Sequence, residues 1–227
     1  MNSAGRLLEQ QRQAERSFVD RELREKRSPT GWPAALIMFH VAQWRERLAA
    51  GLDSFKAGRP YTPPPPDIDE LNDAELPRGA GLTLEETSRR SDELLTHLIQ
   101  LNEEIGDRPF EWRLTRTSSE AIIRNSYLHP RTHIAAYYRE NGEEVTAWKL
   151  VEDTVADLRA ESGPPVVMGA ALYNLAAVRL AQHKHDEALA LLEEGIAMRP
   201  DLRAAAGSDP DLAALKGDPQ FQALTSA

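Results

Sequence analysis

Hydrophobic residues recur with a helical period along almost the whole chain, and very few segments alternate as a β-strand would. The spacing predicts a first helix over residues 4–26, whose many charged positions indicate a solvated surface face. It predicts a second helix that begins near Thr30, with Thr30 as N-cap and Pro33 in the first turn. The buried stripes are expected to be Leu7, Ala14 and Phe18 in the first helix, and Ile37, Val41, Trp44 and Leu48 in the second.

Residues 58–81 interrupt this period with four consecutive prolines, which cannot join a helix and favour an extended connection. A third helix is predicted from Thr83, which forms a capping-box pattern with Glu86, to about residue 104. A fourth is predicted from residue 118 to Gly142, because glycine is favoured just after a helix C-terminus. Four long helices and one long crossover predict an all-α four-helix bundle over residues 1–145.

The last third of the chain has a different pattern. Residues 146–162 are interpreted as a bridging helix or linker, and residues 163–227 as a small helical unit with an antiparallel helix pair. Two Asp-Pro pairs, at 209–210 and 218–219, predict N-caps of short helices with proline in the first turn. A single helix pair cannot bury its apolar face alone, so it must pack on these short helices, on the bundle or on a second chain. Small residues expected at the helix contact are Ala176, Ala188 and Gly195.

Composition and charge exclude several classes of function. The chain has 27 basic and 36 acidic residues, a net charge of −9, which argues against a nucleic-acid-binding surface. It has no cysteine, so thiolate nucleophiles, disulfides and cysteine-based metal sites are excluded. It has no glycine-rich phosphate loop, so no nucleotide cofactor is expected. The longest weakly polar run, Pro164 to Val178, is shorter than the roughly 20 residues of a membrane span, and no signal peptide is visible. A cytoplasmic protein without membrane contact is the expectation.

Three histidines lie on predicted apolar faces. His129 and His133 are four residues apart on the fourth helix, so both project from the same side, and His40 lies within the stripe of the second helix. Two imidazoles at this spacing can bind one ion, and a third ligand from another helix would leave positions open for water or substrate. The candidate metal ligands are therefore His40, His129 and His133. The alternative is that these are hydrogen-bonded core histidines.

Pro130 directly follows His129 and leaves two outcomes open. It has no N–H for the Ser126 carbonyl and disfavours helical geometry at His129. If it breaks the helix, the histidine pair no longer shares a face; if it only kinks the helix, the freed carbonyl lies beside the proposed site. Aromatic residues nearby are candidates to line an apolar substrate pocket, with core packing as the alternative: Trp44, Tyr127 and Tyr137.

Several stretches resemble known families. The stretches "GWPAALIMFHVAQWRERL", "IDELNDAEL" after the prolines, and "IIRNSYLHPRTHIAAYY" resemble the DinB-like superfamily of four-helix bundles, which includes the mycothiol-dependent maleylpyruvate isomerase N-terminal domains. The ClbS/DfsB branch is the most similar one, and the resemblance covers about residues 1–145. The stretch "GAALYNLAAVRLAQHKHDEALALLEEGIAMRPDL" resembles one tetratricopeptide repeat, and the segment after it resembles an end-of-array cap. Matching residues in the ClbS/DfsB branch are His40, Trp44, Asn72, Asn125, Ser126, Tyr127, His129 and His133.

The resemblance implies a function. Histidines at the positions of His40, His129 and His133 commonly bind a divalent ion such as zinc or nickel in the superfamily. It implies a metal-dependent enzyme that acts on an electrophilic small molecule, by hydrolysis or thiol transfer, in detoxification or resistance. The alternative is a non-catalytic protein that binds a small molecule or acts as a scaffold. In that case the tetratricopeptide unit would recruit a peptide partner or form a homodimer.

Overall fold

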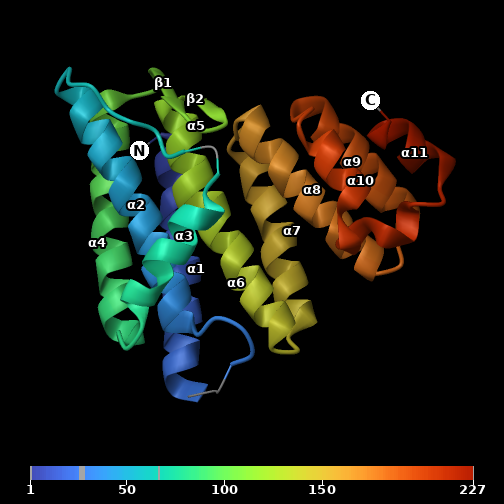
Figure 1. Cartoon of the computed structure of the whole chain (residues 1–227), viewed down its shortest axis with the longest axis horizontal. Helices are drawn as coiled ribbons and strands as arrows, with labels where there is room; N and C mark the ends of the chain where they lie inside the picture. Colours follow the sequence, from blue (N-terminus) through green and yellow to red (C-terminus); the bar gives the residue numbers. More distant parts are fainter. Residues whose placement is uncertain (1, 26–28, 66, 227) are drawn as a thin grey trace. The chain divides into compact units, whose positions relative to one another are not determined.

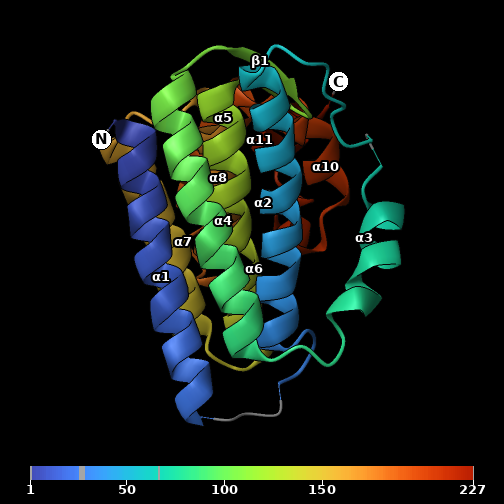
Figure 2. The same ribbon diagram turned by 90° about the vertical axis from the view of Figure 1, so that its left-hand side faces the viewer.

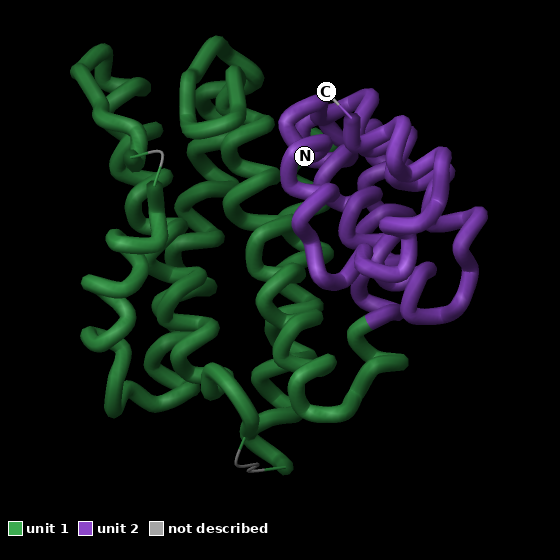
Figure 3. Tube along the Cα trace, turned by 45° about the vertical axis from the view of Figure 1, so that its right-hand side comes forward, with its two compact units in different colours: residues 1–147 green, residues 148–227 purple. Residues whose placement is uncertain are grey.

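The computed structural model describes residues 2–25, 29–65 and 67–226, and the chain divides into two compact units, residues 1–147 and 148–227 (Figure 3). The described residues are predominantly helical, which confirms the expected all-α class. They also contain one small two-stranded sheet (Figure 1). Every helix among the described residues is too short or too polar to cross a lipid bilayer.

In the first unit, four long helical segments lie side by side (Figure 2). Their cores contain most of the residues that the helical period predicted: Leu7, Phe18, Val41 and Leu48 are fully buried, whereas Ala14 is only partly buried. Burying a side chain of this kind contributes roughly 1.5–3 kcal/mol, so the apolar stripes hold the segments together. The segments are α1 (Ser3–Glu25), α2 (Ala34–Lys56), α4 (Leu84–Ile105), and the run α5 (Ser118–Ile123), η2 (Arg124–Leu128) and α6 (His129–Glu140).

The ends of these helices follow the predicted capping only in part. At α4, the Thr83 hydroxyl accepts the Glu86 N–H and the Glu86 carboxylate accepts the Thr83 N–H, so the capping box is confirmed. Thr30 was wrongly predicted as the N-cap of α2, which begins at Ala34 after an extended Pro33 (φ −60°, ψ 151°). The Thr30 N–H donates instead to the Asn141 side chain at 2.9 Å. This hydrogen bond fastens the loop before α2 to the end of α6.

Two segments predicted as connections contain secondary structure. The crossover holds a short helix, α3 (Asp69–Glu75), which continues into the 3-10 turn η1 (Leu76–Gly79). The loop before the fourth helical segment forms a hairpin of β1 (Pro109–Trp112) and β2 (Thr115–Thr117), paired antiparallel. Its Trp112 packs so closely on α2 that a Cβ added at Gly51 would lie 2.7 Å from the indole ring. Such short elements depend on tertiary contacts, which leave no periodicity in the sequence.

The second unit contains the predicted antiparallel helix pair. A Cβ added at Gly169 would lie 2.8 Å from the Gly195 carbonyl oxygen, so the pair requires glycine at its closest approach. The side chains of Asp209 and Asp218 accept backbone N–H groups at the starts of the next short helices, which confirms both predicted caps. Leu212, Leu215 and Phe221 are buried against the pair. The elements are α7 (Glu144–Ala160), which crosses the boundary between units, α8 (Pro165–Ala181), α9 (His185–Met198), α10 (Leu202–Ser208), η3 (Pro210–Leu215) and α11 (Pro219–Thr225).

Candidate metal centre

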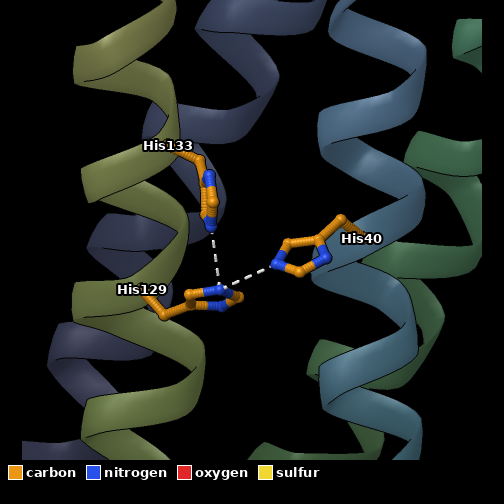
Figure 4. A group of neighbouring side chains, drawn as sticks. All are labelled: His40, His129 and His133. Atoms are coloured by element: carbon orange, nitrogen blue, oxygen red, sulfur yellow. Dashed lines mark hydrogen bonds between the residues drawn. The ribbon is translucent and has the colours of Figure 1, made fainter. Parts of the chain in front are cut away.

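The three predicted metal ligands meet in the first unit (Figure 4). His40 projects from α2, while His129 begins α6 and His133 lies one turn further along it. The Nε2 atom of His129 lies 3.1 Å from Nε2 of His40 and 3.0 Å from Nε2 of His133. One ligand nitrogen of each residue lies within 4.8 Å of the other two. His40 is buried, and His129 and His133 are partly exposed.

Pro130 widens the helix before His129 and does not break it. Residues 124–128 form a π-helical turn, in which the His129 N–H donates to the Arg124 carbonyl five residues earlier. Helix α6 then continues, with Pro130 in its first turn. Turns of this kind are frequent at functional sites. Because the helical run is continuous, His129 and His133 keep the common face that their spacing predicted.

A buried arginine donates to the Ser126 carbonyl, to which Pro130 has no N–H to donate. Arg45 Nη2 donates to the Ser126 carbonyl oxygen at 3.1 Å and to Glu15 Oε1 at 2.6 Å. Its Nη1 donates to Glu15 Oε2 at 2.9 Å and to the Ser91 hydroxyl at 2.6 Å. The Arg45 side chain is completely buried and holds together α1, α2, α4 and the π-turn. The π-turn that places His129 is therefore part of a charged hydrogen-bond network.

Sequence reasoning missed this network. The charged positions of the first helix were predicted as a surface face, but Glu15 and Glu22 are 5% and 7% exposed. The prediction was wrong because a helix rich in charge gives no sign of which carboxylate meets a buried arginine. One signal was present in the sequence. Arg45 lies four residues after Val41 and three before Leu48, which puts it on the apolar face of α2.

The three imidazoles are neutral near pH 7. Burial lowers the pKa of His40 to about 3, with further contributions from His133 and Arg47. Burial also lowers the pKa of His133 to about 4, and burial with its charged neighbours holds the pKa of His129 well below its ordinary value. A neutral imidazole keeps a ring nitrogen lone pair, which is the form that binds a metal ion.

Two of the three nitrogen spacings are close to those expected around a bound metal ion. Metal–nitrogen bonds of about 2.0–2.1 Å at a tetrahedral angle place two ligand nitrogens about 3.3 Å apart. The two Nε2 distances of 3.0 and 3.1 Å are close to that value. The other ring nitrogen of His129, Nδ1, is buried without a hydrogen-bond partner in the described structure. His129 therefore depends on Nε2 for its polar interactions, and this nitrogen is the one that faces Nε2 of both other histidines.

Two tryptophans enclose the imidazoles. The Trp32 ring stacks on His133 with a centroid distance of 5.7 Å and meets the edge of His40 at 5.3 Å. Trp44 lies 6.4 Å from His40 and 6.2 Å from His129, and its indole N–H donates to Asn72 on α3 at 3.1 Å. Gly31, with φ 75°, lies against the Glu140 carboxylate in the loop that positions Trp32. The two indole rings thus pack against all three imidazoles.

A pocket of about 500 Å³ lies beside the cluster, between the start of α2 and the α3–η1 segment. Trp32 belongs both to its wall and to the aromatic surroundings of the histidines. Its walls are mainly apolar, with Asp73 as the charged residue among them. The other lining residues are Pro33, Ala35, Leu36, Leu76, Pro77, Gly79, Ala80, Gly81 and Leu82.

The three aromatic residues expected to line a substrate pocket lie in different places. Trp44 borders the imidazoles. Tyr127 is fully buried, with the Arg131 guanidinium 4.3 Å over its ring. The Tyr137 hydroxyl donates to the Glu22 carboxylate, and Tyr137 lines a second pocket of about 290 Å³. Trp44 is thus the one of the three that lies against the histidines.

No family model, curated protein or solved structure matches this chain. The geometry of the histidine cluster and its surroundings therefore carries the functional argument.

Proposed function

We propose that the chain is a divalent-metal-dependent enzyme that acts on a small electrophilic molecule. His40, His129 and His133 would hold the ion, zinc or nickel, and the pocket beside Trp32 would admit the substrate. The observation that supports this proposal is the convergence of three neutral imidazoles, with one ligand nitrogen of each within 4.8 Å of the others, in a cluster that is partly exposed. We also propose that residues 1–145 form a DinB-like bundle and that the helix pair of the second unit is a single tetratricopeptide repeat, as the sequence resemblance implies.

The chain's own residues have defined tasks in this proposal. A divalent ion bound by three protein ligands supplies a Lewis acid that lowers the pKa of a water or thiol. Trp32 and Trp44 shield the site from bulk water, which strengthens electrostatic interactions within it. Arg45 holds the π-turn through the Ser126 carbonyl and so fixes the direction of His129. The apolar pocket walls favour a substrate with an apolar body, for hydrolysis or thiol transfer in a detoxification role.

Elemental analysis of protein purified without a polyhistidine tag tests the metal ligands. We expect one equivalent of zinc or nickel per chain, and at least a tenfold loss of metal affinity in His133→Ala, because one of three ligands is gone. His97→Ala is the matched control, since His97 is bonded to Asp53 at 2.8 Å, outside the cluster. Circular dichroism checks that both variants fold.

Metal-free protein whose stability is the same in His133→Ala would contradict the metal centre. The result would favour the alternative of a non-catalytic small-molecule-binding protein. Equal metal loss in His133→Ala and His97→Ala would show that the metal binds non-specifically.

A further inference from the structure

Arg113 occupies an unusual backbone position near the histidine cluster. It is the first of two residues, Arg113 and Leu114, that connect β1 to β2, and its φ is 55°. Positive φ values in two-residue hairpin turns favour glycine. The turn is fixed by the Thr115 hydroxyl, which donates to the Trp112 carbonyl at 2.6 Å, and Trp112 is buried beneath it. The chain therefore holds an arginine side chain at a position where glycine would be less strained.

The guanidinium of Arg113 lies over the indole of Trp44, with Cζ 5.6 Å from the ring centroid. Arg47 lies over the same ring at 5.7 Å, but its guanidinium is paired with both carboxylate oxygens of Glu75. Within the described parts of the chain, Arg113 makes no hydrogen bond and no ion pair within 4 Å. Of the two arginines at Trp44, Arg113 is thus the one with a free hydrogen-bonding fork.

The charge of Arg113 is only weakly compensated. Burial lowers the pKa of Arg113, and Asp69, which opposes this effect, lies too far away for an ion pair. The side chain is partly buried, in a chain whose net charge is −9. A partly buried cation without an ion-pair partner is less favourable than one to which an anion binds. The planar guanidinium fork matches a carboxylate, to which it donates two parallel hydrogen bonds.

Arg113 and the histidine cluster both border the indole ring of Trp44. Trp44 contacts the guanidinium of Arg113 and also borders the rings of His40 and His129. Asn72 on α3 holds the Trp44 N–H, so this ring has a fixed orientation. A small molecule with a polar group at the histidines and a carboxylate a few bonds away would meet both sites.

We propose that Arg113 binds the carboxylate of the substrate, and that the substrate is a small organic acid whose reactive end lies at the three histidines. The inference deepens the proposed function and rests on it. It assigns Arg113 the role of a specificity-determining residue. The neighbouring Arg47 does not take this role, because Glu75 already occupies its fork.

Matched hydroxamate ligands test this proposal on cobalt-loaded protein. The first pair of probes is succinic acid monohydroxamate and its amide analogue. Both bind cobalt through the hydroxamate, but only the first carries a carboxylate. The corresponding pair from adipic acid is measured as well, so that the result does not depend on one chain length. Binding is followed by the visible absorption of cobalt. We expect the acid of at least one pair to bind tenfold or more tightly than its amide. We expect Arg113→Gln to abolish this preference without changing affinity for the amide.

Arg108→Gln is the matched control. Arg108 belongs to the same segment and lies over Phe55 rather than Trp44, so its loss removes an equal charge away from the histidines. Arg113→Gly is a second variant that suits the positive φ and keeps the turn folded. Thermal unfolding midpoints confirm that all variants are folded. Equal binding of acid and amide to the unchanged protein, or a preference that survives Arg113→Gln, would overturn the proposal.

A protein that binds no metal would be distinguished from one that lacks only the carboxylate site. If no cobalt binds, the proposed function is wrong, and the carboxylate site is then tested on metal-free protein with succinamate and succinamide by ligand-observed NMR. Binding of succinamate that Arg113→Gln removes and Arg108→Gln retains supports the carboxylate site. Absence of that difference overturns it.

Discussion

Pro130 directly follows His129 and has no N–H to donate to the Ser126 carbonyl. Arg45 donates to that carbonyl instead, and the same guanidinium is paired with Glu15 on α1. The pair is almost completely shielded from water, because the Arg45 side chain has no exposed surface and that of Glu15 is only 6% exposed. Charges buried in this way depend on each other, since removal of one leaves the other without a partner. The placement of His129 is thus coupled to a salt bridge between α1 and α2.

Replacing Arg45 tests this coupling. We expect Arg45→Met to lower the free energy of unfolding by roughly 3–5 kcal/mol, because Glu15 is left buried and unpaired. Arg47→Met, which removes a partly exposed salt bridge from the same helix, is expected to lower it by about 1 kcal/mol or less. Urea unfolding followed by circular dichroism measures both.

The double variant Arg45→Met with Glu15→Leu should recover most of the lost stability, since no buried charge remains. Similar losses in Arg45→Met and Arg47→Met would show that the buried pair contributes no more than a surface pair. A double variant as unstable as Arg45→Met would show that the loss arises from packing and not from charge.

Among the elements, the long helices were predictable and the short ones were not. Helix α4 has its start signal in the sequence, because Thr83 and Glu86 lie three residues apart and cap each other. The hairpin and α3 have no comparable signal: Trp112 is held by its packing against Gly51 on α2, and η1 by Gly79 against Phe39. For the candidate site, helical spacing was sufficient to predict that the three histidines lie on apolar helix faces. It could not predict the π-turn before His129, because that turn is held by a hydrogen bond from Arg45.

The helix pair α8–α9 gives a prediction at the same scale. An added methyl group at Gly169 would lie 2.8 Å from the Gly195 carbonyl oxygen, which belongs to a helix backbone and cannot move alone. We expect Gly169→Ala to lower the free energy of unfolding by roughly 1–3 kcal/mol, the usual effect of overpacking. Urea unfolding followed by circular dichroism provides the measurement.

The control is Gly207→Ala in α10, where an added Cβ meets nothing within 4 Å. It should leave stability unchanged or raise it by up to about 1 kcal/mol, because alanine is the better helix former. If Gly169→Ala is as stable as Gly207→Ala, the two helices do not need glycine at their contact.

At the scale of the whole molecule, each unit has its own buried core, and the candidate chemistry lies in one of them. The division at residues 147 and 148 comes from the compactness of the two units, whereas the sequence suggested 145 and 163 from changes in pattern. All three clustered histidines belong to the first unit, as do Trp32, Trp44 and Trp112. Tryptophan fluorescence therefore reports mainly on the unit that contains the site.

The clustered histidines should make the metal-free chain acid-sensitive. In the unfolded chain a histidine has a pKa of about 6.5, whereas His40 and His133 have pKa values of about 3 and about 4 in the folded protein. Their contribution to stability is complete above pH 6.5 and is lost as the pH falls towards these folded values, because only the unfolded chain binds the protons. Each should lose roughly 2 kcal/mol between pH 7 and pH 5.

Urea unfolding of chelator-treated protein at pH 7 and pH 5, followed by tryptophan fluorescence, measures this loss. We expect His133→Ala to lose roughly 2 kcal/mol less than the unchanged chain over this interval, because one titrating group is gone. His185→Ala, at an exposed position at the start of α9, should lose as much as the unchanged chain. An equal loss in all three proteins would mean that His133 is protonated alike in the folded and unfolded chain, which contradicts a buried neutral imidazole ready to bind a metal ion.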